Sequence, residues 1–148
     1  GRVSAWSEII ESSLGELNSF LQDSEWFGRE NEVVSLYAHE FLPRRLKEGS
    51  VFTSLSQIGI EVAVPQVTGS VKKYVRKDMV IWNKPMGTIW TERSPAVIVE
   101  WKVNGLKNCE KDIQWLNLFT TRYPETLGYS VCASIKRNRG VEYTKVLA

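Results

Sequence analysis

Three residues near the middle of the chain have types and a spacing that suit phosphate chemistry: Asp78, Glu100 and Lys102. Asp78 lies near the start of the mainly apolar segment 77–82, while Glu100 and Lys102 close the apolar segment 96–102. Both segments are predicted to be strands, and successive side chains of a strand point to opposite faces, so Glu100 and Lys102 share a face. Pairing of the two segments as a hairpin would bring Asp78 close to Glu100. Charged groups at the end of a buried strand are costly unless they bind something, and a divalent metal and a phosphate would suit these.

This set of side chains suits phosphodiester hydrolysis. Carboxylates supply the hard oxygen ligands that Mg²⁺ prefers, so Asp78 and Glu100 are the predicted metal ligands, with Mn²⁺ as a substitute. A bound metal lowers the pKa of water and draws charge from phosphoryl oxygens. Lys102 is expected to orient or deprotonate the attacking water and to offset charge in the transition state. The simpler alternative is a set of solvated charges at strand ends, but Glu100 and Lys102 close a run of apolar residues.

Apolar periodicity predicts the elements that must position these residues. Helices are expected over 4–22, 29–46 (bent near Pro43) and 109–122, and further strands over 58–65, 129–135 and 141–147. The predicted order is α-α-β-β-β-α-β-β. That order indicates one α/β (α+β) domain over residues 1–148, with a mixed β-sheet flanked by helices.

Asp78 on one strand and Glu100-x-Lys102 on the next resemble the motif of the PD-(D/E)XK nuclease superfamily. The resemblance covers about residues 29–135 and matches the superfamily's α-β-β-β-α-β core, with an extra N-terminal helix and C-terminal strand. It implies a restriction-endonuclease-like fold and a Mg²⁺-dependent nuclease that hydrolyses phosphodiester bonds in DNA. Lys77 stands where the eponymous proline would be, which leaves the subfamily open.

Members of this superfamily often add an acidic residue from the helix before the sheet. Glu30, Glu32 and Glu40 are the candidates here. Glu30 and Glu40 fall within the apolar stripe of the helix, whereas Glu32 lies off it. Glu30, at the head of the helix, is the preferred fourth catalytic residue. The alternative is that all three are solvated charges on the helix surface. A contribution of Glu61, on the first strand, also stays open.

A net charge of +2 gives no global attraction to a polyanion, so any basic surface must be local. One basic cluster, Lys72, Lys73, Arg76 and Lys77, directly precedes Asp78. It could contact phosphates or protect a strand edge from aggregation, and both readings stay open. The residues 136–139 are interpreted as a charged turn. Further candidates for substrate contact are Lys107, Lys111, Gln114 and, as a stacking surface, Trp90.

Cys109 and Cys132 are the only cysteines and are interpreted as free thiols in a reducing, cytoplasmic compartment. With a single histidine beside them, a structural zinc site is disfavoured. No apolar run approaches the roughly 20 residues that span a bilayer, so no membrane partner is expected. DNA is the expected partner, and a homodimer or larger complex stays open.

Two other classes of protein compete with the nuclease. One is a catalytically inactive nucleic-acid-binding or assembly module of the same fold, and the other is a plain α/β interaction domain. The presence of all three of Asp78, Glu100 and Lys102 argues against the inactive module. No glycine-rich phosphate loop of the G-x-x-x-x-G-K-[ST] type is present, so nucleotide hydrolysis has no support. Endonuclease against exonuclease action, strandedness and DNA against RNA stay open.

Overall fold

A computed structural model describes residues 1–85, 94–105 and 109–148. Its centre is a five-stranded mixed sheet with the order β1-β2-β3-β4-β5, in which β3 and β4 are parallel and the other neighbours antiparallel. The strands are β1 (Ile58–Pro65), β2 (Tyr74–Ile81), β3 (Val97–Val103), β4 (Leu127–Ser134) and β5 (Gly140–Val146). The α-helices of the described part are α1 (Arg2–Asp23), α2 (Glu30–Leu36) and α3 (Cys109–Arg122). The predicted α+β class and the order of elements are confirmed.

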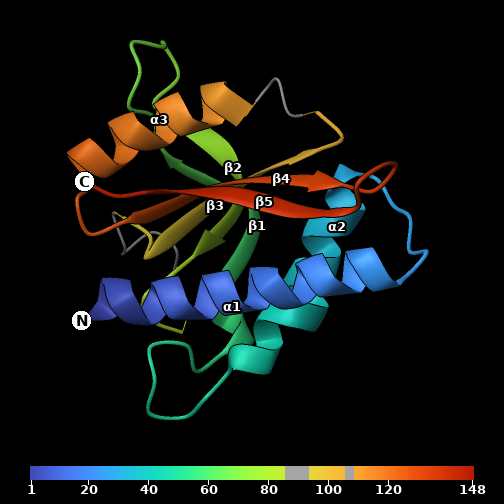
Figure 1. The fold of residues 1–148 in the computed structure, drawn as a ribbon. Helices are drawn as coiled ribbons and strands as arrows, with labels where there is room; N and C mark the ends of the chain where they lie inside the picture. Colours follow the sequence, from blue (N-terminus) through green and yellow to red (C-terminus); the bar gives the residue numbers. More distant parts are fainter. Residues whose placement is uncertain (86–93, 106–108) are drawn as a thin grey trace.

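The helices cover both faces of the sheet. α1 and α2 lie on one face and α3 on the other (Figure 1). On the first face, apolar residues of α1 at helical spacing pack with Tyr37 and Trp101, whose ring centroids are 5.2 Å apart. On the second face, Leu116 and Phe119 of α3 pack on Ile98 of β3 and its neighbours. Because β3 is buried on both sides, any polar side chain it carries must lie near its end.

The helical run predicted over 29–46 is present but not uniform. α2 continues as a π-helical turn, Tyr37–Phe41, and a 3₁₀ turn, Leu42–Arg45, which contains Pro43. Proline has no backbone N–H to donate, so a regular α-helix cannot continue unchanged through it. The predicted bend near Pro43 therefore coincides with a change of helix type.

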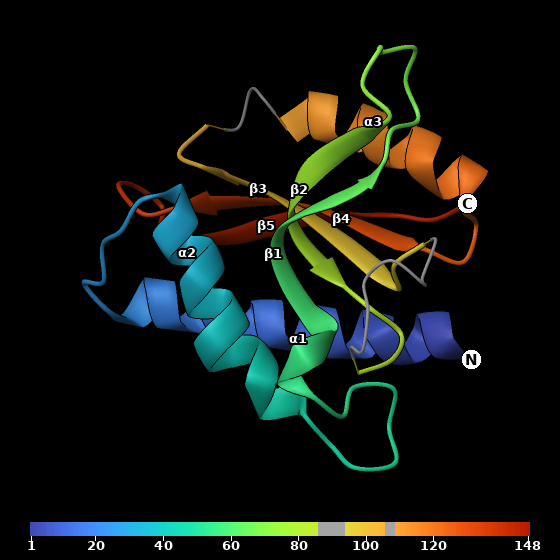
Figure 2. The same cartoon turned by 180° about the vertical axis from the view of Figure 1, so that it is seen from behind.

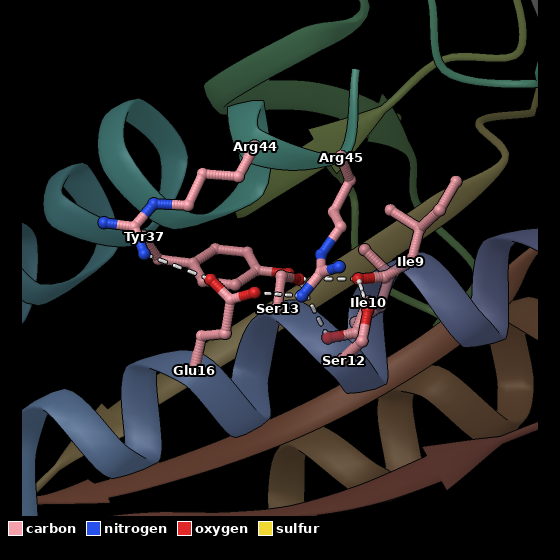
Figure 3. Close-up of polar contacts among 8 residues, drawn as sticks. All are labelled: Ile9, Ile10, Ser12, Ser13, Glu16, Tyr37, Arg44 and Arg45. Atoms are coloured by element: carbon pink, nitrogen blue, oxygen red, sulfur yellow. Dashed lines mark hydrogen bonds and ion pairs between the residues drawn. The ribbon is translucent and has the colours of Figure 1, made fainter. Parts of the chain in front are cut away.

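Polar contacts fix this run against α1 (Figure 3). The Tyr37 hydroxyl and Ser13 Oγ lie 2.6 Å apart in the buried interface. Glu16 of α1 accepts hydrogen bonds from Arg44, at 3.1 Å, and from Arg45. We call these residues, with Glu40, the α1–α2 junction. Since α2 is continuous with this run, the junction helps to set where its first residue, Glu30, lies.

The first two strands extend beyond the rest of the sheet. β1 and β2 are in register from Ile58↔Ile81 to Pro65↔Tyr74, whereas β2 pairs with β3 only from Met79↔Val99 to Ile81↔Val97. Residues 62–77 therefore form a two-stranded ribbon, here called the β1–β2 arm. Its turn projects beside α3 (Figures 1 and 2).

The two cysteines are not free thiols. Cys109, in the first turn of α3, and Cys132, on β4, form a disulfide. The two lie 23 residues apart in sequence, and they meet because α3 connects the parallel strands β3 and β4 and returns across the sheet. Sequence spacing alone does not reveal that approach. The interpretation as free thiols was wrong, so it gives no support to a reducing compartment, and the cytoplasmic location stays a prediction.

Candidate functional site

Asp78 and Glu100 lie at the point where β2 and β3 separate. The ladder of backbone hydrogen bonds between β2 and β3 ends at the pair Met79↔Val99. Beyond this pair, the side chains of Asp78 and Glu100 make the hydrogen bonds that join the two strands. The Asp78 N–H donates to Glu100 Oε1 at 3.2 Å, and the Trp101 N–H donates to Asp78 Oδ2 at 2.8 Å. The predicted approach of Asp78 to Glu100 is confirmed, and each carboxylate is held by the backbone of the opposite strand.

At this point the side chains of β2 also switch from one face of the sheet to the other. Met79 packs in the core beneath α1 and α2, whereas Lys77 and Val75 face α3, although all three have odd numbers. An uninterrupted strand would place them on one face. The register passes from Ile60↔Met79 to Val62↔Lys77 without a pair between Glu61 and Asp78, and Glu61 has a left-handed backbone, with φ at 53°. That conformation costs roughly 1–2 kcal/mol in a residue other than glycine.

Glu100 is a buried carboxylate with too little positive charge around it. Its side chain is 7% exposed, and Lys77 Nζ, the cation that pairs with it among the described residues, is 3.9 Å from Oε1. Burial raises the pKa of Glu100 to about 8, and the neighbouring charge of Asp78 adds to the rise, while Lys77 opposes it. A cation bound beside the two carboxylates would remove this penalty.

Lys102 faces a carboxylate that the sequence did not single out. Its Nζ lies 3.3 Å from Oδ2 of Asp112 on α3. Burial lowers the pKa of Lys102, but the charges of Asp112, Glu30 and Asp78 outweigh it, and the net shift is upward. Lys102 is therefore held as an ammonium group.

Asp112 is a member of this cluster that sequence reasoning missed. It is half-buried and lies four residues before Leu116, on the stripe of α3 that faces the sheet. Burial raises its pKa, although Lys102 opposes the rise. The signal was present, because a carboxylate in an apolar helical stripe needs a partner. The candidates predicted for substrate contact lie elsewhere. Lys111 and Gln114 are exposed, and Lys107 and Trp90 lie outside the described residues.

Among the three helix glutamates, Glu30 is exposed but lies near enough to the cluster for the charges of Asp78 and Lys102 to affect its pKa. Desolvation raises the pKa of Glu30, Asp78 adds to the rise, and Lys102 and a hydrogen bond from the Val103 backbone oppose it. The other two have local roles. Glu32 accepts a hydrogen bond at 3.0 Å from the Arg29 N–H at the start of α2, and Glu40 pairs with Arg44 at 2.8 Å. Glu61 is exposed.

Lys77 has a different environment from its neighbours in the basic cluster. It is 9% exposed, and its Nζ lies 3.7 Å from the centre of the Trp115 ring, a cation–π distance. Trp115 Nε1 in turn donates to Gln66 Oε1 at 2.9 Å. Lys77 thus fastens the arm to α3 and places a positive charge near Glu100, a position that the sequence pattern did not indicate.

The donor set is suitable for Mg²⁺, although it is small. No three His, Cys, Asp or Glu side chains in the described ranges are grouped closely enough to hold a metal ion. Mg²⁺ is commonly bound by one or two carboxylates and several waters, so Asp78 and Glu100 alone are compatible with it. The raised pKa of Glu100 is the observation that fits a cation at this position. Metal binding itself stays a prediction.

Comparisons of the chain with family models, with curated proteins and with solved structures gave no match. No helix in the described part of the chain is long and apolar enough to cross a membrane.

Proposed function

We propose that this protein is a Mg²⁺-dependent nuclease that hydrolyses phosphodiester bonds in DNA. The observation that carries the proposal is the reciprocal pairing at the strand separation, where Asp78 and Glu100 each accept a hydrogen bond from the other strand. This pairing places two carboxylates at one point, where burial and the charge of Asp78 raise the pKa of Glu100. Lys102 follows two residues later on the same strand.

The fold supports the same proposal. The order α2-β1-β2-β3-α3-β4 corresponds to the α-β-β-β-α-β core of restriction-endonuclease-like proteins, with α1 and β5 as additions. The first three strands are antiparallel neighbours and β4 returns parallel to β3. On this basis we propose that the chain has that fold.

Each side chain has a defined role in the proposed reaction. Asp78 and Glu100 would bind Mg²⁺, which when bound supplies a water of lowered pKa and charge neutralisation at the phosphate. Lys102, kept protonated by Asp112, Glu30 and Asp78, donates hydrogen bonds to the water or to a phosphoryl oxygen. Glu30 holds its negative charge at the edge of the cluster, where it supports Lys102.

The test is cleavage of circular and linear DNA in Mg²⁺, Mn²⁺ or EDTA, with the Lys102→Ala variant beside the wild type. Lys136→Ala is the matched control, because Lys136 is an exposed lysine in the β4–β5 turn. We expect metal-dependent cutting by the wild type and the control, and none by Lys102→Ala. Cutting that survives in Lys102→Ala or in EDTA would contradict the proposal.

A second candidate is a catalytically inactive nucleic-acid-binding or assembly module. It is favoured by one observation, namely that no group of three carboxylates, cysteines or histidines is gathered in the described residues. Calorimetric titration with Mn²⁺ separates the two candidates from a plain interaction domain. Binding of Mn²⁺ without cutting, or binding of DNA with neither Mn²⁺ binding nor cutting, indicates the inactive module, and the absence of all three removes both candidates.

A further inference from the structure

The β1–β2 arm concentrates positive charge that the composition of the whole chain conceals. The chain has 19 basic and 17 acidic residues, nearly in balance. Residues 62–77 contain Lys72, Lys73, Arg76 and Lys77 and no aspartate or glutamate. A local excess of this kind, on a segment that projects from the sheet, is typical of a surface that binds a polyanion.

One face of the arm is anchored to α3. Val62, Val67 and Val75 pack on the core beneath that helix, and Val64 is buried in it. Trp115 adds two polar contacts, one from its Nε1 to Gln66 and one under the Lys77 ammonium group. The arm is therefore fixed in place along this face.

The opposite face of the arm is exposed. It carries the cross-strand pairs Ala63↔Arg76 and Pro65↔Tyr74, and Tyr74 is 63% exposed. Lys72 and Lys73 are exposed at the turn. This face thus presents an aromatic side chain flanked by three cations, held by a rigid support.

The arm leads directly to the candidate site. Arg76 and Lys77 immediately precede Asp78 on β2, the residue at which β2 and β3 separate. In Figure 2 the arm rises on one side of this separation and α2 lies on the other. A phosphate bound by Arg76 would lie two residues along β2 from Asp78.

We propose that the exposed face of the β1–β2 arm binds the phosphate backbone of duplex DNA and positions the duplex at the site. This inference rests on the proposed nuclease function and names its substrate as double-stranded. Duplex DNA carries one negative charge per about 1.7 Å of its axis, against about 3.4 Å along one strand, so its charge density suits a face with three cations. Lysine and arginine contacts to phosphates fix position and carry no sequence information, so the arm gives affinity and not sequence specificity.

The experiment measures binding of a fluorescent 20-base-pair duplex by anisotropy in EDTA, as a function of salt concentration. Lys73→Ala/Arg76→Ala is compared with Lys136→Ala/Arg137→Ala, which removes the same two residue types from the exposed β4–β5 turn. Two lost phosphate contacts reduce the magnitude of the slope of log K against log salt by about 1.8. We expect that change in the arm variant and the wild-type slope in the control. Thermal unfolding of both variants checks that they are folded.

Equal slopes in the two variants would overturn the inference. So would tighter binding of single-stranded than of duplex DNA, with the larger loss in Tyr74→Ala. Binding to anionic phospholipid vesicles as tight as binding to the duplex would also overturn it. Because no metal is present, the result is independent of cleavage. Cleavage with normal binding by the arm variant removes the inference and leaves the nuclease. Arm-dependent duplex binding without cleavage removes the nuclease and supports the arm as a DNA-binding surface.

Discussion

The α1–α2 junction and the strand separation at Asp78 are both clusters of charge between elements, but they are balanced differently. At the junction two glutamates, Glu16 and Glu40, meet two arginines, Arg44 and Arg45. At the strand separation four carboxylates, Glu30, Asp78, Glu100 and Asp112, share two lysines, Lys77 and Lys102. A cluster that serves structure neutralises its own charges. The second cluster has more carboxylates than cations and a buried carboxylate of raised pKa, which is the pattern expected of a functional site and is the ground of the proposed metal site.

The largest expected effect is a loss of DNA cleavage when a carboxylate is removed from the strand separation and not when one is removed from the α1–α2 junction. Asp78→Asn removes a predicted metal ligand, and we expect DNA cleavage to fall roughly a thousandfold or more, because metal-ion catalysis supplies several kcal/mol. Glu16→Gln removes a carboxylate of similar exposure from the junction and should leave cleavage intact, at a loss of at most about 1 kcal/mol of stability. Cleavage rates and urea unfolding measure both. Similar losses of activity in the two variants would contradict the distinction between a functional and a structural cluster.

The disulfide beside the strand separation gives the next largest effect. Replacing Cys109 and Cys132 together by serine releases a cross-link between residues 23 apart, and we expect the free energy of unfolding to fall by about 3 kcal/mol. Reduction of the wild type should give a similar fall, whereas the double-serine variant should not respond to reductant. Urea unfolding with and without reductant measures this. An unchanged midpoint in the variant would show that the cross-link does not stabilise the fold.

The buried carboxylate predicts an unusual dependence of stability on pH. The pKa of Glu100 is raised from 4.5 to about 8, so the folded state binds more protons than the unfolded state between these values. Stability from this group is therefore full below pH 4.5 and is lost as pH rises towards 8. In EDTA at pH 8, thermal unfolding should show that Glu100→Gln is more stable than the wild type, by a few kcal/mol in the free energy of unfolding, with little difference at pH 4.5.

Mg²⁺ should reduce this difference at pH 8, because it binds the wild type and favours ionised Glu100. Glu16→Gln is the control from the junction. If Glu100→Gln is less stable than the wild type at pH 8 in EDTA, the carboxylate is not the destabilising charge described above.

The smallest effect concerns Asp112, which positions Lys102. Removing its charge in Asp112→Asn lowers the pKa of Lys102, since Asp112 is the largest contribution that raises it. We expect about a tenfold loss of activity, or roughly 1.4 kcal/mol, and an alkaline limb of the pH–rate profile that moves to lower pH. Asp23→Asn at the exposed end of α1 is the control. Higher activity of Asp112→Asn at neutral pH would indicate instead that Lys102 acts as a base.

Much of the cluster followed from local pattern. The alternation along β3 placed Glu100 and Lys102 on one face and Trp101 in the opposite core, and both placements are present. The apolar stripe of the helix disfavoured Glu32, and the position of Glu30 at the head of the helix favoured it over Glu40; its catalytic role stays a prediction. The roles of Lys77 and Asp112 were not anticipated, because each depends on a partner far along the chain: Trp115 for Lys77 and Lys102 for Asp112.

The sequence by itself determined the order of helices and strands, the class of fold, and the approach of Asp78 to Glu100. These depend on hydrophobic periodicity and on the pairing of neighbouring strands, which are local properties. The tertiary structure alone decided the Cys109–Cys132 bond, the change of face at Asp78 and the placement of α3. These arise where a helix crosses the sheet and where a ribbon leaves it, because such contacts join segments whose separation along the chain carries no periodic signal.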